Sequence, residues 1–139
     1  SQTAEYALRA ALALARDHPK AMTTQQIAKQ MQIPASYLAK VLQALARGQV
    51  VRSQRGLGGG FSLRRPPEQI TLLEVLEPVD PIKRIKSCPL DVDDHQVNLC
   101  PLHRRLDAAI AQVREAFSKT TLAELVYDEN PCPHGINES

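Results

Sequence analysis

Residues 52–65 read RSQRGLGGGFSLRR and carry most of the information about the fold. The segments on either side of the glycines, residues 50–51 (VV) and 61–63 (FSL), consist of residue types that are common in β-strands. The glycines from Gly58 to Gly60 allow positive φ angles and a close approach of the backbone to another molecule. The pattern therefore predicts a β-hairpin with a glycine tip and arginines at both ends.

A basic block surrounds this hairpin. From His18 to Pro67 the chain has no aspartate or glutamate, whereas the 139 residues together carry 17 basic and 15 acidic side chains and a net charge of +2. The basic residues of the block are Lys20, Lys29, Lys40, Arg47, Arg52, Arg55, Arg64 and Arg65. Because the positive charge is concentrated in one segment, the composition predicts a polyanionic partner, nucleic acid above all.

Apolar residues at helical spacing predict three helices before the hairpin. They cover about 3–17, a second segment that starts at Thr23 or Thr24, and about 35–47. A tight link through Pro34 joins the last two helices. Two short helices joined by a tight turn and followed by a hairpin predict a winged helix-turn-helix. In that fold the helix over 35–47 enters the major groove, and the hairpin reaches the neighbouring minor groove.

The expected DNA contacts follow from these positions. Side chains near the start of the helix over 35–47, or on its outer face, address base edges, and those at the start of the preceding helix touch phosphates. An arginine beside the glycine tip enters the minor groove, where negative potential is concentrated. The expected residues are Thr24 and Gln25 on phosphates, Ser36, Tyr37, Lys40 and Gln43 in the major groove, and Arg55 with Gly58, Gly59 and Gly60 in the minor groove.

A phosphate-binding enzyme loop is a weaker explanation of the glycines. Phe61 stands where a dinucleotide fingerprint needs its third glycine, and no Gly-Lys-Ser/Thr follows. No nucleophile and base are paired elsewhere in the sequence, so we expect no enzyme. A solvated basic turn, or a module that binds an acidic protein, remains as an alternative use of the basic block.

The second half of the chain predicts a dimer. A short helix begins near Thr71, and a long one begins at Pro101, a residue favoured in the first turn. The long helix carries one apolar stripe, formed by Leu102, Leu106, Ala109, Ile110, Val113 and Phe117, and a second copy of the chain is its natural cover. We therefore expect a mainly α fold with a small β-hairpin, a winged helix-turn-helix plus a long dimerisation helix.

This fold divides the chain into four parts. They are a DNA-binding domain over 1–80, a cysteine-containing sensor loop over 81–100, the dimerisation and terminal helices over 101–127, and a flexible tail over 128–139. No apolar run approaches the roughly 20 residues that cross a bilayer, and no signal peptide is expected. Three cysteines are an odd number, which favours cytosolic thiols or a metal site over a disulfide framework and indicates a cytoplasmic protein.

Ordered motifs identify a family. They are Thr3 to Leu8 (TAEYAL), Ile33 to Leu38 (IPASYL), Arg55 to Phe61 (RGLGGGF), Ile70 to Val75 (ITLLEV), Cys100 to His103 (CPLH) and Thr121 to Leu125 (TLAEL). With them the chain resembles the Rrf-two (Rrf2) family of dimeric bacterial transcription regulators, which includes iron–sulfur and nitric-oxide sensors. The resemblance implies a homodimer crossed at the long helix and bound to a palindromic operator. It also implies that Ser36, Tyr37 and Arg55 lie at the DNA surface.

The resemblance further implies an iron–sulfur site. Cluster-bearing members use three cysteines before the dimer helix, often with a histidine one turn later or a carboxylate from the partner's first helix. Cys88, Cys100 and His103 match the first cysteine, the last cysteine and the histidine, and Glu5 matches the carboxylate. The middle cysteine is absent, and Asp94 and His95 occupy its neighbourhood.

The chemistry of these residues supports a cluster and leaves alternatives open. Cys100 precedes Pro101 at a helix N-terminus, which favours the thiolate, and His103 shares its face. Two thiolates with nitrogen or carboxylate ligands suit a [2Fe–2S] cluster. Zinc bound by Cys88, Cys100, His103 and either Asp94 or His95 is the second possibility. The third is a cluster-free regulator that responds through cysteine oxidation or a small ligand.

Overall fold

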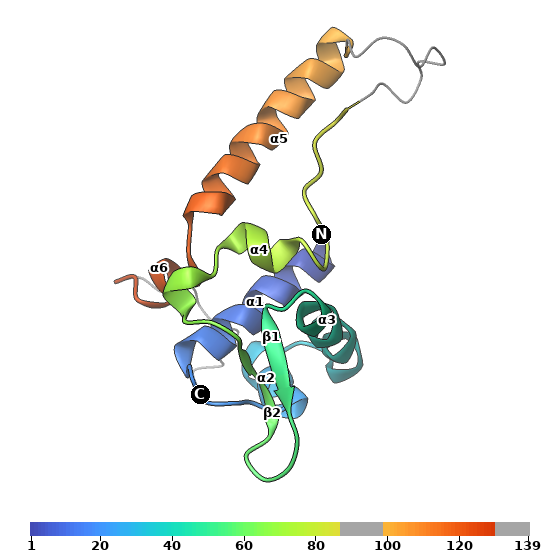
Figure 1. Cartoon of the computed structure of the whole chain (residues 1–139). Helices are drawn as coiled ribbons and strands as arrows, with labels where there is room; N and C mark the ends of the chain where they lie inside the picture. Colours follow the sequence, from blue (N-terminus) through green and yellow to red (C-terminus); the bar gives the residue numbers. More distant parts are fainter. Residues whose placement is uncertain (87–98, 130–139) are drawn as a thin grey trace.

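The computed structural model describes residues 1–86 and 99–129 (Figure 1). Its elements, in chain order, are α1 (Gln2–Arg16), α2 (Thr24–Met31), α3 (Ala35–Arg47), β1 (Val51–Gln54), β2 (Gly60–Leu63), the 3-10 turn η1 (Pro67–Gln69), α4 (Leu72–Leu76), α5 (Pro101–Lys119) and α6 (Leu122–Val126). The structure confirms the prediction of a mainly helical fold with one small hairpin, a winged helix-turn-helix followed by a long helix. Among the described helices, none combines the length and hydropathy needed to cross a membrane.

Helix α1 forms the centre of the core. It packs against α2, α3, α4, α6 and β2, and every residue from Ala10 to Ala15 is buried. The sequence pattern predicts a single apolar face that includes Leu8, but Leu8 is only half-buried. Alanine is abundant here because several helices approach one axis closely, and a larger side chain would hold them apart.

The helix-turn-helix is built from α2 and α3. Thr23, and not Thr24, caps α2: its Oγ1 accepts from the Gln26 N–H at 3.1 Å, and the Gln26 Oε1 accepts from the Thr23 N–H at 2.9 Å. Gln32, with φ of 56°, ends α2 in the left-handed conformation. Helical spacing in the sequence predicts that Ile27, Ala28 and Met31 of α2 and Leu38, Val41, Leu42 and Leu45 of α3 face inward, and all of them are buried.

The hairpin is tied to the start of α2. Strands β1 and β2 pair antiparallel, from Val51 opposite Leu63 to Gln54 opposite Gly60. Met22, just before α2, extends the pairing: its N–H donates to the Phe61 carbonyl at 2.8 Å, and the Phe61 N–H donates back at 2.7 Å. The hairpin is therefore held against the turn that leads into α2.

Helix α5 projects away from the body of the molecule (Figure 1). None of its residues is buried, and Leu102, Leu106 and Val113 are 64%, 46% and 42% exposed. The C-terminal end of α5 is held by backbone hydrogen bonds on both sides: Leu72 N–H to the Thr120 carbonyl at 3.0 Å, and Leu122 N–H to the Ile70 carbonyl at 2.9 Å. An exposed helix with an apolar stripe and no buried residue is the form expected of a dimerisation helix.

The contact between Gly60 and Met22 generates a stability prediction. Gly60 has φ of +131°, and a Cβ there would lie 2.3 Å from the Met22 carbonyl oxygen. We expect Gly60→Ala to lower the free energy of unfolding by about 2 kcal/mol, from backbone strain together with the clash. Gly56, with φ of +90° and no atom near an added Cβ, is the matched control. Chemical denaturation should show a smaller loss for Gly56→Ala, and equal losses would contradict the packing argument.

Candidate nucleic-acid interface and cysteine site

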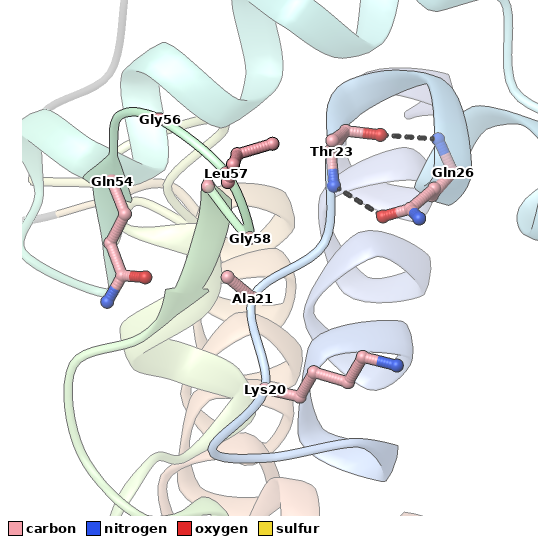
Figure 2. A pocket seen from close by; sticks show the side chains of 10 residues that line it. Lys20, Ala21, Thr23, Gln26, Gln54, Gly56, Leu57 and Gly58 are labelled. Atoms are coloured by element: carbon pink, nitrogen blue, oxygen red, sulfur yellow. Dashed lines mark hydrogen bonds between the residues drawn. The ribbon is translucent and has the colours of Figure 1, made fainter.

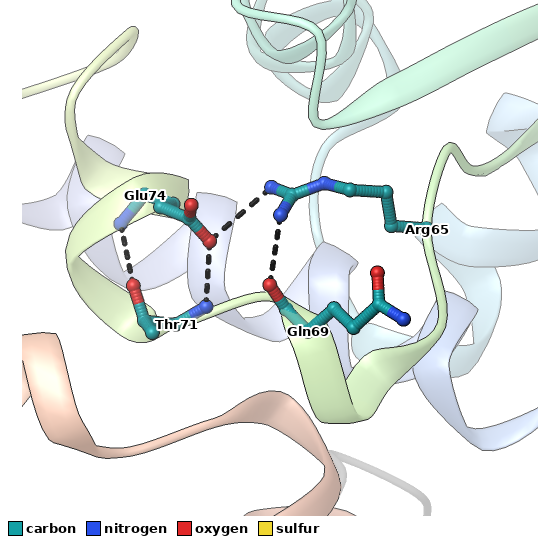
Figure 3. A network of polar contacts seen from close by, with 4 residues as sticks. All are labelled: Arg65, Gln69, Thr71 and Glu74. Atoms are coloured by element: carbon teal, nitrogen blue, oxygen red, sulfur yellow. Dashed lines mark hydrogen bonds and ion pairs between the residues drawn. The ribbon is translucent and has the colours of Figure 1, made fainter.

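The basic block forms an exposed surface. Of its eight cations, Arg65 is used inside the fold: it donates to the Gln69 carbonyl at 2.8 Å and pairs with Glu74 at 3.2 Å, where Glu74 also completes the Thr71 capping box of α4 (Figure 3). The remaining cations are exposed and have no salt bridge within residues 1–86 and 99–129; they are Lys20, Lys29, Lys40, Arg47, Arg52, Arg55 and Arg64. The positive field inferred from the sequence therefore faces solvent, apart from the contribution of Arg65.

Three of the residues expected in the major groove lie free on α3. Ser36, Lys40 and Gln43 are all exposed along the surface opposite the buried leucines. At the start of α2, Gln25 is exposed and Thr24 is half-buried beside the Thr23 cap. These positions suit contacts with base edges and phosphates, respectively.

Tyr37 has a different environment. Its hydroxyl lies 2.6 Å from the Thr3 Oγ1, and its ring packs edge-to-face on Tyr6 with centroids 5.4 Å apart. Arg9 stacks on the other member of the pair, 5.8 Å from the Tyr6 centroid. Tyr37 therefore joins the start of α3 to the start of α1, although its side chain remains 39% exposed.

A groove separates the start of α2 from the tip of the hairpin (Figure 2). Its volume is about 450 Å³. The residues that line it are Lys20, Ala21, Thr23 and Gln26 on one side and Gln54 with residues 56–60 on the other. The sequence does not predict Lys20, Thr23 or Gln26 as neighbours of the hairpin tip, because their proximity arises from the Met22–Phe61 pairing and not from any local pattern.

The tip glycines do not all serve one purpose. An added Cβ at Gly58, where φ is +74°, would meet no atom within 4 Å, so this position is open to another molecule. At Gly59 a Cβ would lie 2.6 Å from the Gln54 carbonyl, and at Gly60 it would meet Met22. The fold itself therefore requires Gly59 and Gly60, whether or not they also approach DNA.

The cysteine site begins at the free end of α5. Cys100 is the residue before the first turn, and its Sγ lies 3.0 Å from the Nδ1 of His103. This contact brings together two of the residues predicted as metal ligands. Cys88, Asp94 and His95 lie outside the described residues. Within the described ranges, no group of three or more histidine, cysteine, aspartate or glutamate side chains gathers around one point.

Glu5 lies near the base of α5, away from Cys100. It is in the first turn of α1, 3.9 Å from Arg9, and lines a cavity of about 370 Å³ together with Leu8, Ile82 and Phe117. Phe117 is near the base of α5, whereas Cys100 precedes its first turn. A rise of 1.5 Å per residue separates them by about 25 Å along the helix axis. Glu5 and Cys100 of the same chain therefore cannot share a metal ion.

The connector that leads to Cys88 is fixed along α5. Arg84 donates two hydrogen bonds of 2.7 Å to the Asp107 carboxylate, and the Ile85 N–H donates a third at 3.0 Å. The hydrogen bonds from Arg84 lower the pKa of Asp107 to about 2. Arg114 donates to the Ile82 carbonyl and pairs with Glu77 at 3.3 Å. The sequence gives no signal for these contacts, because the partners lie on an irregular segment and a helix that are distant in the chain.

Comparison with known proteins identifies the family. The profile of the Rrf2 family, described as iron-dependent transcriptional regulators, matches residues 1–128. The chain belongs to the Rrf2 family. An HTH-type transcriptional regulator from Aquifex aeolicus is 32% identical over 129 residues, 91% of this chain and 90% of the relative. An rrf2-like regulator from Rhodobacter capsulatus is 37% identical over 131 residues, 91% and 83% of the two chains.

Solved structures agree with this assignment. CymR, the global cysteine regulator of B. subtilis, is 26% identical with a TM-score of 0.73 over 91% of this chain and 94% of its own. IscR from T. potens has a TM-score of 0.77 over 94% and 87% of the two chains; at 19% identity it supports the fold alone. Rrf2 regulators bind DNA and act as dimers. The chain is thus a DNA-binding transcriptional regulator, and an acidic protein is not needed to explain the basic block.

The Arg84–Asp107 contact of this Rrf2 protein predicts the pH range in which the Asp107 carboxyl titrates. Because the folded-state pKa of Asp107 is lowered, the contact stabilises the fold fully above the ordinary aspartate pKa near 4, and this stabilisation is lost as the pH falls through about 2. NMR titration of the Asp107 carboxyl should give the low value in the wild type and the ordinary value in Arg84→Gln. Arg114→Gln, which changes a neighbouring cation, should leave it low. An ordinary value in the wild type would exclude the contact.

Proposed function

We propose that this Rrf2 regulator is a cytoplasmic protein whose affinity for a palindromic operator is controlled by a redox-sensitive iron–sulfur cluster at the dimer interface. The observation that supports the proposal most directly is the contact of Cys100 with His103 at the free end of α5. Thiolate and imidazole are ligand types found in iron–sulfur sites, and a [2Fe–2S] cluster accepts such a mixed set. The residues present therefore fit the group that the family implies.

The proposed ligands come from two subunits. Cys88, Cys100 and His103 of one chain are three of them, and Glu5 of the partner subunit is the fourth. The partner is required because Glu5 of the same chain lies about five helical turns from Cys100. The exposed stripe of Leu102, Leu106 and Val113 offers the surface along which a second copy would bring its first helix to this end of α5.

The parts of the chain have distinct roles in this proposal. Residues 1–80 bind DNA through α3, the start of α2 and the hairpin, which is the wing. Residues 81–100 form the sensor loop, residues 101–127 the dimerisation and terminal helices, and residues 128–139 a tail. When bound, the cluster supplies one-electron redox chemistry. The chain's own contribution is Cys100 as a sulfur ligand and a weaker ligand in Glu5 of the partner subunit.

A mechanical connection runs from the sensor loop to the wing. The Arg84–Asp107 contact fixes the connector to α5, so a movement of the loop is transmitted to the helix. The base of α5 is hydrogen-bonded on one side to α4 and on the other to η1, through Leu72 and Ile70. Helix α4 in turn packs on α1. Helix α1 also packs on β2 of the wing. A change at the sensor loop would therefore change the distance between the two wings of the dimer.

A cluster-free thiol sensor is the second candidate. It is favoured by the same Cys100–His103 contact, because a thiol beside a histidine is an arrangement found at reactive cysteines. CymR, which this chain resembles at 26% identity, is named as a cysteine regulator. In this version hydrogen peroxide oxidises the thiols of Cys88 and Cys100 to a disulfide and is itself reduced to two molecules of water.

Spectroscopy and metal analysis separate the candidates. Protein purified without oxygen should show thiolate-to-iron charge-transfer absorption and equal amounts of iron and sulfide. Cys88→Ala and Cys100→Ala should abolish both, because each removes a thiolate, and Glu5→Gln should alter the spectrum. Cys132→Ala, in the tail, is the matched control and should leave both intact.

The functional measurement is the affinity for the operator in the oxidised, reduced and cluster-free states. Allosteric coupling energies of 1–3 kcal/mol correspond to a change of roughly 5- to 150-fold, and we expect a difference in that range. Colourless, iron-free protein whose affinity changes with peroxide would favour the thiol sensor. Bound zinc in place of iron and sulfide would favour the zinc site. Equal affinity in every state would exclude regulation through Cys88 and Cys100.

A further inference from the structure

The tip of the wing ends in one fully exposed apolar side chain. Leu57 has a relative exposure of 107%, so it touches no other part of the described chain. Its neighbours Gly56 and Gly58 both have positive φ, and an added Cβ at either would meet no atom within 4 Å. A single exposed leucine on a protein surface needs no explanation. Here, however, the leucine is the only side chain between two glycines at the end of a basic hairpin, which makes the tip both narrow and apolar.

Leu57 also lines the groove between the wing and the start of α2 (Figure 2). Lys20 lies on the opposite side of this groove, exposed and without a salt bridge in the part of the chain that the structure describes. No carboxylate is among the lining residues. The groove therefore presents one cation, Lys20, and one large apolar side chain, Leu57, together with the polar side chains of Thr23, Gln26 and Gln54.

The position of the groove matches the path of one DNA strand. In a winged helix-turn-helix, the recognition helix lies in the major groove and the wing in the next minor groove. The backbone strand that separates these two grooves passes between the helix-turn-helix and the wing. The gap between the start of α2 and the tip, with a volume of about 450 Å³, lies between the same two elements.

We propose that this groove holds one strand of the DNA backbone, with Lys20 on a phosphate and Leu57 against the deoxyribose at the edge of the minor groove. The proposal rests on the DNA binding described above and is independent of the cluster. A backbone strand alternates anionic phosphates with apolar sugars, and the two sides of the groove offer a matching pair of contacts. The minor groove is only about 6 Å wide, so the absence of side chains at Gly56 and Gly58 allows the tip to enter.

Leu57 and Lys20 contribute to affinity in different ways. Lys20 acts through counterion release, so its contribution depends on salt concentration. Leu57 acts by removing apolar surface from water, and its contribution does not change the number of neutralised phosphates. Salt titrations of single variants therefore distinguish the two roles.

The experiment uses full-length protein purified without oxygen and a duplex that this protein selects from random sequences. We expect Leu57→Ala to weaken binding about tenfold with an unchanged slope of log affinity against log salt, from the loss of buried methyl groups in both wings. Leu57→Met, which restores the apolar surface, should bind within about threefold of the wild type. Lys20→Gln should reduce the salt slope by about one per protomer. Lys83→Gln, an exposed lysine on the connector, is the control and should change neither quantity.

Two results would overturn the proposal, and they are distinguishable. If Leu57→Ala and Lys20→Gln bind as the wild type does, with equal slopes, the strand does not lie in this groove, although the protein remains a DNA-binding regulator. If the wild type selects no sequence at all, the proposed operator binding fails and this inference fails with it. Both side chains are exposed, so circular dichroism and thermal unfolding should show an unchanged fold in all variants.

Discussion

Two backbone hydrogen bonds between Met22 and Phe61 join the wing to the segment that leads into the helix-turn-helix. They join the segment before α2 to the outer edge of β2, so that the wing and the helix-turn-helix share one rigid frame. Gly60 permits the close approach, since a side chain at that position would meet the Met22 carbonyl. The groove lined by Lys20 and Leu57 arises from this pairing, because it brings the start of α2 beside the hairpin tip.

The features of the fold and of the site that can be predicted from the sequence are those that depend on local patterns. The buried face of α3 and the proximity of Cys100 to His103 both follow from helical spacing, and both are found. The burial of α1 on all sides, the Met22–Phe61 pairing and the Arg84–Asp107 contact are not local, because each depends on how distant segments pack. The same holds for Arg65, which belongs to the basic block in sequence but neutralises Glu74 in the structure.

The proposed sensor site depends on the exposure of α5. Most of the stability of a helix in a protein comes from packing of its apolar face, and α5 has no buried residue within one chain. Its apolar stripe therefore needs the second chain of the dimer as a cover. The position of Glu5 also indicates that the proposed site needs a second chain. It lies beside the base of α5 and far from Cys100 of the same chain, which makes the proposed ligand set incomplete in a monomer. Dimerisation and cofactor binding would then be one event and not two.

The length of α5 relates a displacement at its Cys100 end to a rotation at its base. Its 19 residues span about 28 Å, and its base is the pivot, held by the backbone contacts of Thr120 and Leu122. For an arm of that length, a displacement of ~2 Å at Cys100 corresponds to a rotation of only ~4° at the pivot. In the proposed mechanism, a displacement at Cys100 would therefore reach the core as a small rotation of the base of α5. Such a helix suits small, graded changes in the relative position of the two DNA-binding domains better than the unfolding or release of either domain.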